Sequence, residues 1–273
     1  MPPVDPSPSA SGGPRRLALV TGASAGIGRC FAERLARDAW DLVLVARRQD
    51  RLDALAETLR AAHGRRVDVV AADLTAPAGL RAIEQRIAAE PTLELLVNNA
   101  GFGTAGVFAE LDRDGEEQEL RLNVLALVRL THAALGAFRE RGHGSVVNVS
   151  SLAGFQPAPF NAIYGATKAF VNSFTQALHE ELRGSGVRVQ LLCPGFTRTE
   201  FQEVAGVRTD DVPGFAWMEP EAVVEASLEA LRSGDLLVIP GAGNKVMGAV
   251  LRALPSAAAR RLGGLLLRRT LAD

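Results

Sequence analysis

The sequence predicts an α/β protein with a doubly wound parallel sheet of about seven strands and helices on both faces. Short β-rich segments alternate with longer helical segments along most of the chain. The strand segments are continuous Val and Leu runs, as expected when helices cover both faces of a sheet. A glycine-rich turn joins the first predicted strand to the first predicted helix. Together these observations favour parallel strands joined by right-handed crossovers.

Each predicted strand is a short apolar run. In order, the strands are RLALVTG (16–22), DLVLVAR (41–47), RVDVVAADL (66–74), LELLVNNAG (93–101), GSVVNVSS (144–151), VRVQLLCPG (187–195) and LLVIPG (236–241).

Helices are predicted between the strands. The first covers 26–38, where Ile27, Phe31 and Leu35 recur at helical spacing and share one face. The remaining helices are expected at 50–62, roughly 77–89, 115–140, 161–183 and 220–232. No linker divides this region, so residues 16–241 are predicted to form one Rossmann-type domain.

The ends of the chain differ from this pattern. Residues 1–15 are rich in Pro, Ser and Gly and lack the apolar core of a secretory signal, which predicts a disordered tail. No run of about 18 apolar residues predicts a membrane span. We therefore expect a cytoplasmic protein.

Composition argues against two classes of function. The net charge is −1, whereas a general nucleic-acid-binding protein usually carries a basic excess. The two cysteines and four histidines are scattered and show no metal-ligand spacing. We expect neither nucleic-acid binding nor a protein-bound metal.

The glycine-rich turn reads VTGASAGIG, residues 20–28, with glycines at 22, 26 and 28. Such glycines allow a tight turn and a close approach of the backbone to a phosphate, while the helix N-terminus adds free N–H groups. This location favours a dinucleotide site. The alternative is a tight turn without a ligand.

The end of the second predicted strand indicates which dinucleotide binds. Proteins that bind NAD usually place an acidic residue here for the ribose 2′-hydroxyl, but this chain has Arg47 and Arg48. A guanidinium suits a 2′-phosphate. We therefore predict NADP(H), with Arg47 as the main contact. Alternatively, both arginines are solvated surface charges.

Tyr164 is the only tyrosine in the chain, and Lys168 follows it at i+4 on a predicted helix, so both side chains share one face. An ammonium nearby lowers the pKa of a phenol, and a positively charged nicotinamide would lower it further. Tyr164 could then act as a general acid or base. Ser150 and Ser151 end the fifth predicted strand, where a hydroxyl could bind the substrate oxygen.

These motifs, in this order, resemble the short-chain dehydrogenase/reductase family over roughly residues 16–241. The resemblance rests on the TGxxxGxG turn, NNAG (98–101), a serine before YxxxK, and PGFTRT (194–199). Ser151 lies 13 residues before Tyr164, the usual family spacing, and is preferred to Ser150. The family implies catalytic roles for Asn123, Ser151, Tyr164 and Lys168, with Asn123 holding a relay water. Asn123 could instead satisfy backbone groups at a helix kink.

The resemblance also implies a set of cofactor-binding residues. Asp73 would contact the adenine, although it could simply cap a helix, and Lys168 would bind the nicotinamide ribose. The full set is Gly22, Ser24, Gly26, Ile27, Gly28, Arg47, Arg48, Asp73, Leu74, Asn99, Ala100, Gly101, Tyr164, Lys168, Pro194, Gly195, Thr197 and Thr199. Many relatives that use NADP carry a basic residue in the glycine turn where this chain has Ala25. NAD(H) therefore stays open as a weaker alternative.

The segment after PGFTRT corresponds to the substrate lid of the family and is apolar here. With Ser151 and Phe155, the residues Phe201, Phe215 and Trp217 are predicted to line the substrate pocket. Such a pocket favours a small hydrophobic carbonyl or alcohol, such as a 3-oxoacyl thioester, a steroid-like ketone or an aromatic ketone. Alternatively, the lid packs on itself and carries no information about the substrate.

Residues 242–273 form a predicted basic amphipathic helical extension. Val246, Met247, Val250, Leu251 and Leu254 make one apolar stripe, and residues 242–272 contain six basic residues and no acidic ones. Such a helix can lie on an anionic membrane. The alternative is that it packs on the protein or at a subunit interface. The family commonly forms homodimers or homotetramers through helices that correspond to 115–140 and 161–183.

Two functions remain open from the sequence. The first is an NADP(H)-dependent oxidoreductase that moves a hydride between nicotinamide and a carbonyl or alcohol carbon. The second is a non-catalytic NADP(H)-binding regulator or scaffold. Relatives of that second kind tend to lose the tyrosine or lysine, and this chain has both.

Overall fold

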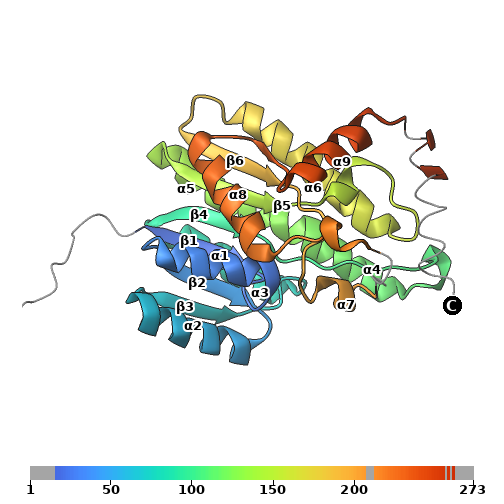
Figure 1. Ribbon diagram of the computed structural model, residues 1–273. Coiled ribbons are helices and arrows are strands. Elements are labelled where there is room, and N and C mark those ends of the chain that lie inside the picture. The colour runs from blue at the N-terminus through green and yellow to red at the C-terminus, as the bar shows by residue number, and fades with distance from the viewer. Residues whose placement is uncertain (1–15, 207–211, 256, 259, 262–273) are drawn as a thin grey trace, which may run out of the picture.

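Seven parallel strands form one sheet in the order β3-β2-β1-β4-β5-β6-β7 (Figure 1). The computed structural model describes residues 16–206, 212–255, 257–258 and 260–261. The strands are β1 (Leu17–Thr21), β2 (Asp41–Ala46), β3 (Val67–Ala71), β4 (Leu93–Asn98), β5 (Gly144–Val149), β6 (Val187–Leu192) and β7 (Leu237–Val238). All seven predicted strands are present, and the doubly wound fold is confirmed.

The strand order reverses between β1 and β4. In the register of the sheet, Leu19 lies opposite Val43 of β2 on one side and Leu96 of β4 on the other. The chain leaves β1 toward one edge of the sheet and returns to begin the other half at β4. In such sheets a crevice opens at this point beyond the carboxyl ends of the strands, where ligands bind.

Helices cover both faces of the sheet (Figure 1). They are α1 (Gly26–Arg37), α2 (Gln49–His63), α3 (Pro77–Ala88), α4 (Arg113–Leu120), α5 (Leu127–Arg141), α6 (Ala162–Glu181), α7 (Phe201–Val204), α8 (Pro220–Ser233) and α9 (Ala242–Ala253). One core cluster buries residues of α1, α2 and α8 against the sheet. A second buries residues of α3 and α5 on the opposite face, and Val171 of α6 belongs to a third.

The predicted helix 115–140 is interrupted in the structure. A π-helical turn, Arg121–Ala126, separates α4 from α5 and contains Asn123. A π turn holds one more residue than an α turn and is frequent at functional sites. The hydrophobic periodicity continues through it, which is why one helix was predicted over 115–140, with a kink at Asn123 only as an alternative.

Together, α4, the π turn and α5 form one 29-residue stretch, Arg113–Arg141. Within the described ranges this stretch alone is long and apolar enough to cross a membrane by length and composition. However, α5 packs against β4, β5 and α3. We interpret the stretch as a core helix.

The C-terminal helix α9 packs on the body of the protein through its small residues. Gly248 is buried, and a Cβ built there would lie 2.7 Å from Cδ1 of Ile239. Gln156 Nε2 donates hydrogen bonds to the carbonyl oxygens of Leu251 and Leu254, at 2.5 and 3.0 Å.

The predicted apolar stripe of this helix is therefore divided. Leu251 packs on the core, whereas Val246, Met247 and Val250 are exposed. The predicted N-terminal tail and residues 262–273 of the extension lie outside the described residues.

Candidate active site

The glycine turn after β1 is closely packed at its backbone. Gly22 has a φ of +67°, and a Cβ there would lie 2.9 Å from Cα of Ala100. A Cβ at Gly28 would lie 2.4 Å from the carbonyl oxygen of Gly22. No side chain caps the start of α1, where Ala25 is the N-cap residue. These features fit the phosphates of a dinucleotide.

The loop after β4 is tied to this turn. The hydroxyl of Thr21 accepts hydrogen bonds from the N–H groups of Asn99 and Ala100, both at 3.0 Å. Asn99 Nδ2 donates to the carbonyl oxygen of Thr21 at 2.9 Å. The ends of β1 and β4 are thus held together at the crevice of the sheet.

Arg48 lies directly on the glycine turn. Its Nε and Nη2 donate to Ser24 Oγ at 3.2 and 3.1 Å, and its Nη1 donates to Glu200 at 2.8 Å. Arg47, the predicted main phosphate contact, is exposed and lies close enough to Asp73 for its charge to act on that carboxyl. The structure therefore places Arg48 on the turn and Arg47 beside the loop that follows β3.

The loop after β3 is ordered by its own side chains. Asp73 accepts hydrogen bonds from the backbone N–H and the hydroxyl of Thr75, at 2.9 and 2.7 Å. Burial raises the pKa of Asp73, but these hydrogen bonds outweigh it, so the net shift is downward. Asp73 thus shapes the loop before α3, whose N-cap residue is Ala76 and which has no side-chain cap. The Leu74 side chain is buried in the second core cluster. The Ile27 side chain is partly buried and packs against the first core cluster.

Ser151, rather than Ser150, faces the tyrosine. A hydrogen bond with Ser151 lowers the pKa of Tyr164, although burial dominates and raises that pKa to about 12. Ser150 is buried instead, and its hydroxyl lies 2.6 Å from Oδ1 of Asn172. The net lowering of the tyrosine pKa that the sequence predicts is not found, because burial disfavours the charged phenolate.

Lys168 is buried beneath the tyrosine. Its Nζ donates to the carbonyl oxygen of Val149 at 3.0 Å and lies 5.6 Å from the centre of the Tyr164 ring. Burial lowers the pKa of Lys168 to about 8, while the charge of Glu119 acts in the opposite direction. This ammonium is therefore close to its titration range at neutral pH.

Asn123 lies next to this lysine. Its Oδ1 accepts from the backbone N–H of Phe102 at 3.1 Å, and its Nδ2 donates to the carbonyl oxygen of Phe102 at 2.8 Å. A Cβ at Gly101 would meet both Asn123 Oδ1, at 2.9 Å, and Lys168 Nζ, at 3.7 Å. Gly101 thus lets the loop after β4 approach the catalytic side chains.

Two buried carboxyl groups below Asn123 were not predicted. Glu116 and Glu119 both contact the hydroxyl of Thr104. That hydroxyl has one hydrogen, so it can donate fully to only one of them at a time. Burial raises the pKa of Glu119 to about 7. Their spacing with Asn123, at i, i+3 and i+7, places all three on one helix face and was a usable signal.

The PGFTRT loop returns to the glycine turn. Pro194 and Thr197 are buried, and Thr197 Oγ1 donates to the carbonyl oxygen of Gly195 at 3.2 Å. A Cβ at Gly26 would lie 2.9 Å from Cγ2 of Thr199. Asn244 of α9 was not predicted, yet its side chain lies against Gly195.

The predicted pocket residues separate into two groups. The Phe201 ring lies 5.3 Å from the Tyr164 ring, and Phe155 packs near Leu152 in the third core cluster. Phe215 is 92% exposed and lines no buried wall, which corrects its predicted place. Trp217 packs against Phe196, with ring centres 5.6 Å apart. The lid packs partly on itself, because Phe196 and Trp217 cover each other.

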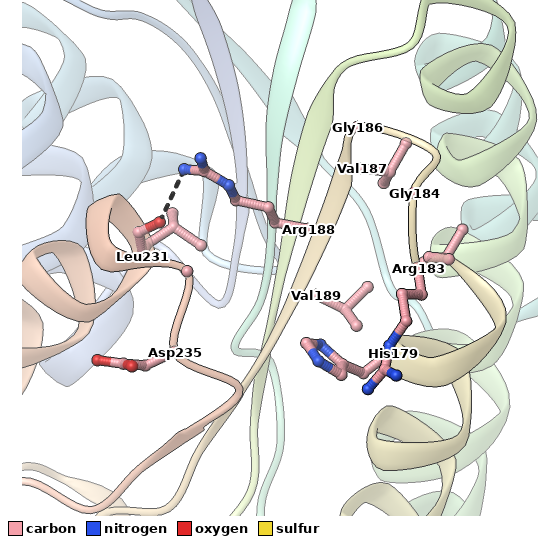
Figure 2. Close-up of a pocket in the computed structure, with 11 residues that line it drawn as sticks. His179, Arg183, Gly184, Gly186, Val187, Arg188, Val189, Leu231 and Asp235 are labelled. Atoms are coloured by element: carbon pink, nitrogen blue, oxygen red, sulfur yellow. Dashed lines mark hydrogen bonds between the residues drawn. The ribbon is translucent and has the colours of Figure 1, made fainter.

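A separate surface cavity of about 290 Å³ lies far from these residues (Figure 2). It is lined by the end of α6, the start of β6 and the end of α8, including His179, Arg188 and Asp235. Arg188 there donates to the carbonyl oxygen of Leu231. This is the amino end of β6, opposite the edge that holds Ser151 and Tyr164, so we do not place the active site here.

The chain is similar in sequence to proteins of known activity. A family model described as short chain dehydrogenase matches residues 16–208. Sulfoacetaldehyde reductase 2 of Chromohalobacter salexigens is 39% identical over 68% of this chain and 74% of its own length. The very-long-chain 3-oxoacyl-CoA reductase of Homo sapiens is 31% identical over 88% of this chain and 75% of its own length.

Solved structures match over most of their length. A short-chain dehydrogenase from Sphingobium yanoikuyae in complex with NADPH is 41% identical, with a TM-score of 0.81, and covers 92% of this chain and 95% of its own. A bulky-bulky ketone specific alcohol dehydrogenase from Comamonas testosteroni is 35% identical, with a TM-score of 0.76, and covers 90% of this chain and 97% of its own.

Proposed function

This chain belongs to the short-chain dehydrogenase family, and from that premise we propose that it is an NADP(H)-dependent reductase or dehydrogenase for hydrophobic carbonyl compounds or alcohols. The reaction class is that of a nicotinamide-dependent oxidoreductase acting on carbonyl or alcohol groups. The finer proposal adds the preferred cofactor, the roles of the site residues and the kind of substrate.

The observation that carries the proposal is the placement of Ser151, Tyr164 and Lys168 around one point beside the glycine turn. Ser151 donates a hydrogen bond to the substrate oxygen, and Tyr164 donates or accepts the proton at that oxygen. Lys168 stabilises the phenolate through its charge. The nicotinamide, when bound, supplies or accepts the hydride.

The preference for NADP(H) rests on two arginines at the end of β2. Arg48 is already positioned on Ser24 of the glycine turn, and the neighbouring Arg47 is exposed. Guanidinium groups bind phosphate through charge-assisted hydrogen bonds, which the 2′-hydroxyl of NAD(H) cannot match. The similar chain from Sphingobium yanoikuyae was solved with NADPH. NAD(H) is the weaker alternative cofactor.

A hydrophobic substrate is favoured by the aromatic ring over the catalytic tyrosine. The Phe201 ring lies 5.3 Å from the Tyr164 ring. The named relatives act on compounds as different as sulfoacetaldehyde, very-long-chain 3-oxoacyl-CoA and bulky ketones. A 3-oxoacyl thioester or a bulky ketone fits the apolar surroundings of this chain better than a small anionic aldehyde does.

The test is oxidation of NADPH and of NADH, followed by absorbance, over a panel of hydrophobic carbonyl compounds, with Tyr164→Phe as the control. We expect turnover with NADPH that falls by about 10²–10⁴-fold in the variant. Sulfoacetaldehyde belongs in the panel, since a strong preference for it would overturn the hydrophobic substrate. Tight NADPH binding without turnover of any compound would favour a non-catalytic regulator or scaffold instead.

Self-association is proposed through α4, the following π turn and α6. Leu120, Leu125 and Phe170 are large apolar residues on these elements, and each is more than 40% exposed. Burial of such residues against a second copy would remove apolar surface from water. Light scattering should give the mass of a homodimer or homotetramer, whereas the mass of one chain would contradict this.

Peripheral membrane contact is a secondary proposal for a protein that is otherwise cytoplasmic. The exposed face of α9 combines Val246, Met247 and Val250 with the cations of Lys245 and Arg252. Binding to anionic vesicles that is weakened by Val246→Glu and Val250→Glu would support it. Equal vesicle binding by the wild type and by these variants would exclude this face of α9 as a membrane contact.

A further inference from the structure

Three consecutive residues at the start of α7 contact three parts of the cofactor site. Thr199 lies against Gly26 of the glycine turn, where a Cβ would be 2.9 Å from its Cγ2. Glu200 forms ion pairs with Arg48 and Arg51, at 2.8 and 2.5 Å. Phe201 lies on Tyr164. We call these three residues the 199–201 segment.

Glu200 bridges the two arginines. One carboxylate oxygen accepts from Nη1 of Arg48, and the other accepts from Nη1 of Arg51. These hydrogen bonds lower the pKa of Glu200, so the group is charged at neutral pH. A carboxylate held by two guanidinium groups occupies the place that suits a bound phosphate.

The ion pairs of Glu200 are easily exchanged. The side chains of Arg48, Arg51 and Glu200 are 41%, 45% and 42% exposed, and exposed ion pairs contribute little to stability. A phosphate monoester carries nearly two negative charges and three acceptor oxygens. It is therefore the stronger partner for the same guanidinium groups.

Glu200 and a phosphate would compete for only one nitrogen of the Arg48 guanidinium, Nη1. Its Nε and Nη2 are occupied by Ser24, which belongs to the glycine turn, and its Nη1 is occupied by Glu200. A phosphate at this position can keep the arginine on Ser24 and replace Glu200 at Nη1. Exchange therefore does not require the turn itself to move.

We propose that Glu200 determines cofactor specificity by competing with the 2′-phosphate of NADP(H) for Arg48 and Arg51. Binding of the phosphate releases Glu200 from the arginines, and with it the 199–201 segment. NAD(H) has a hydroxyl at this position and leaves Glu200 paired. This inference rests on the proposed use of NADP(H). It gives Glu200, a residue of the lid, a role in cofactor specificity in addition to those of the glycine turn and the arginines.

Phe201 extends the consequence to the catalytic residue. It directly follows Glu200, and its ring packs on Tyr164. Release of Glu200 therefore frees the ring that covers Tyr164. The 2′-phosphate site and the substrate site are in this way connected through one peptide bond.

The test compares the binding of 2′,5′-ADP and 5′-AMP, which differ only in the 2′-phosphate, by isothermal titration calorimetry. In Glu200→Gln we expect 2′,5′-ADP to bind about threefold to fivefold tighter, which corresponds to about 0.6–1 kcal/mol. Binding of 5′-AMP should not change. Glu203→Gln removes an exposed carboxylate from the same short helix and is the matched control, in which both affinities should stay as in the wild type.

Each other outcome has a defined meaning. Weaker binding of 2′,5′-ADP in Glu200→Gln would show that Glu200 positions the arginines rather than competes for them. An unchanged affinity, or an equal gain for 5′-AMP or in Glu203→Gln, would also overturn the competition. If the wild type itself did not prefer 2′,5′-ADP, the proposed use of NADP(H) would fail first, and the role of Glu200 would fail with it.

Amide hydrogen exchange gives a readout independent of affinity. In the wild type, 2′,5′-ADP should increase exchange in a peptide that covers residues 199–206, whereas 5′-AMP should not. In Glu200→Gln the exchange of this peptide should already be high without a ligand. Protection of the peptide by 2′,5′-ADP in the wild type would contradict the release of the segment.

Discussion

The ammonium nitrogen of Lys168 lies 3.0 Å from the carbonyl oxygen of Val149, which accepts its hydrogen bond. This contact ties the lysine to the end of β5, two residues before Ser151. The lysine therefore acts on Tyr164 from a fixed position below the ring rather than through a direct hydrogen bond.

Replacement of Lys168 by methionine should move the pH dependence of alcohol oxidation. Without the ammonium, the phenolate of Tyr164 loses a favourable charge, so the rate should rise only at higher pH than in the wild type. The rate at pH 7 should fall by about 10²-fold or more. The matched control is Lys245→Met, which removes the only other lysine in the chain. An unchanged pH profile would show that Lys168 is not coupled to the tyrosine.

Glu119 should make the stability of the fold depend on pH. Its pKa is about 7 in the folded protein and 4.5 in the reference state, and burial is the main cause. Because the folded pKa is raised, the stabilising contribution is fully present below about pH 4.5 and is lost as the pH rises through about 7. The neighbouring groups that act on Glu119 are Glu116, Thr104 and Lys168.

The corresponding measurement is urea unfolding between about pH 4.5 and 7. The wild type should lose stability across this range, whereas Glu119→Gln should give a flatter curve because an amide does not titrate. Glu117→Gln changes an exposed residue of the same helix and should behave like the wild type. Parallel curves for the wild type and Glu119→Gln would contradict the raised pKa.

The two arginines at the end of β2 can be separated by mutation. We expect Arg47→Asp and Arg48→Gln each to lower the ratio of kcat/KM for NADPH over NADH by about tenfold or more. A hydrogen bond to a charged group is worth about 1.5–3 kcal/mol. Steady-state kinetics with both cofactors give the ratio. If Arg47→Asp left it unchanged while Arg48→Gln abolished the preference, Arg48 would be the main phosphate contact.

The glycine turn should not tolerate a methyl group at Gly28. An alanine Cβ would lie 2.4 Å from the Gly22 carbonyl oxygen, which belongs to the backbone and cannot turn aside. We expect Gly28→Ala to lose about 1–3 kcal/mol of stability and to weaken 2′,5′-ADP binding. Gly136→Ala is the control, because Gly136 lies within α5 with nothing within 4 Å of its Cβ position. That change should be neutral or stabilising.

The strands were predictable because each is covered on both faces by helices. Such a strand has a continuous run of apolar residues, which is recognisable in the sequence. The catalytic side chains were predictable because Tyr164 and Lys168 share a helix face and Ser151 ends a strand. The π turn at Asn123 was not, since one added residue barely disturbs the hydrophobic periodicity. The places of Phe215 and Arg48 depend on how the lid folds back, and local sequence carries little information about such long-range contacts.

Tyr164 is the single tyrosine of a chain that has two tryptophans, and tryptophan does not titrate. The near-ultraviolet absorption of a phenolate in this protein therefore arises from the catalytic residue alone, without a label or a substitution. Its midpoint should lie at about 12 in the ligand-free protein and fall when a positively charged nicotinamide binds. The protein thus contains its own optical indicator, which reports the protonation of its catalytic acid in solution.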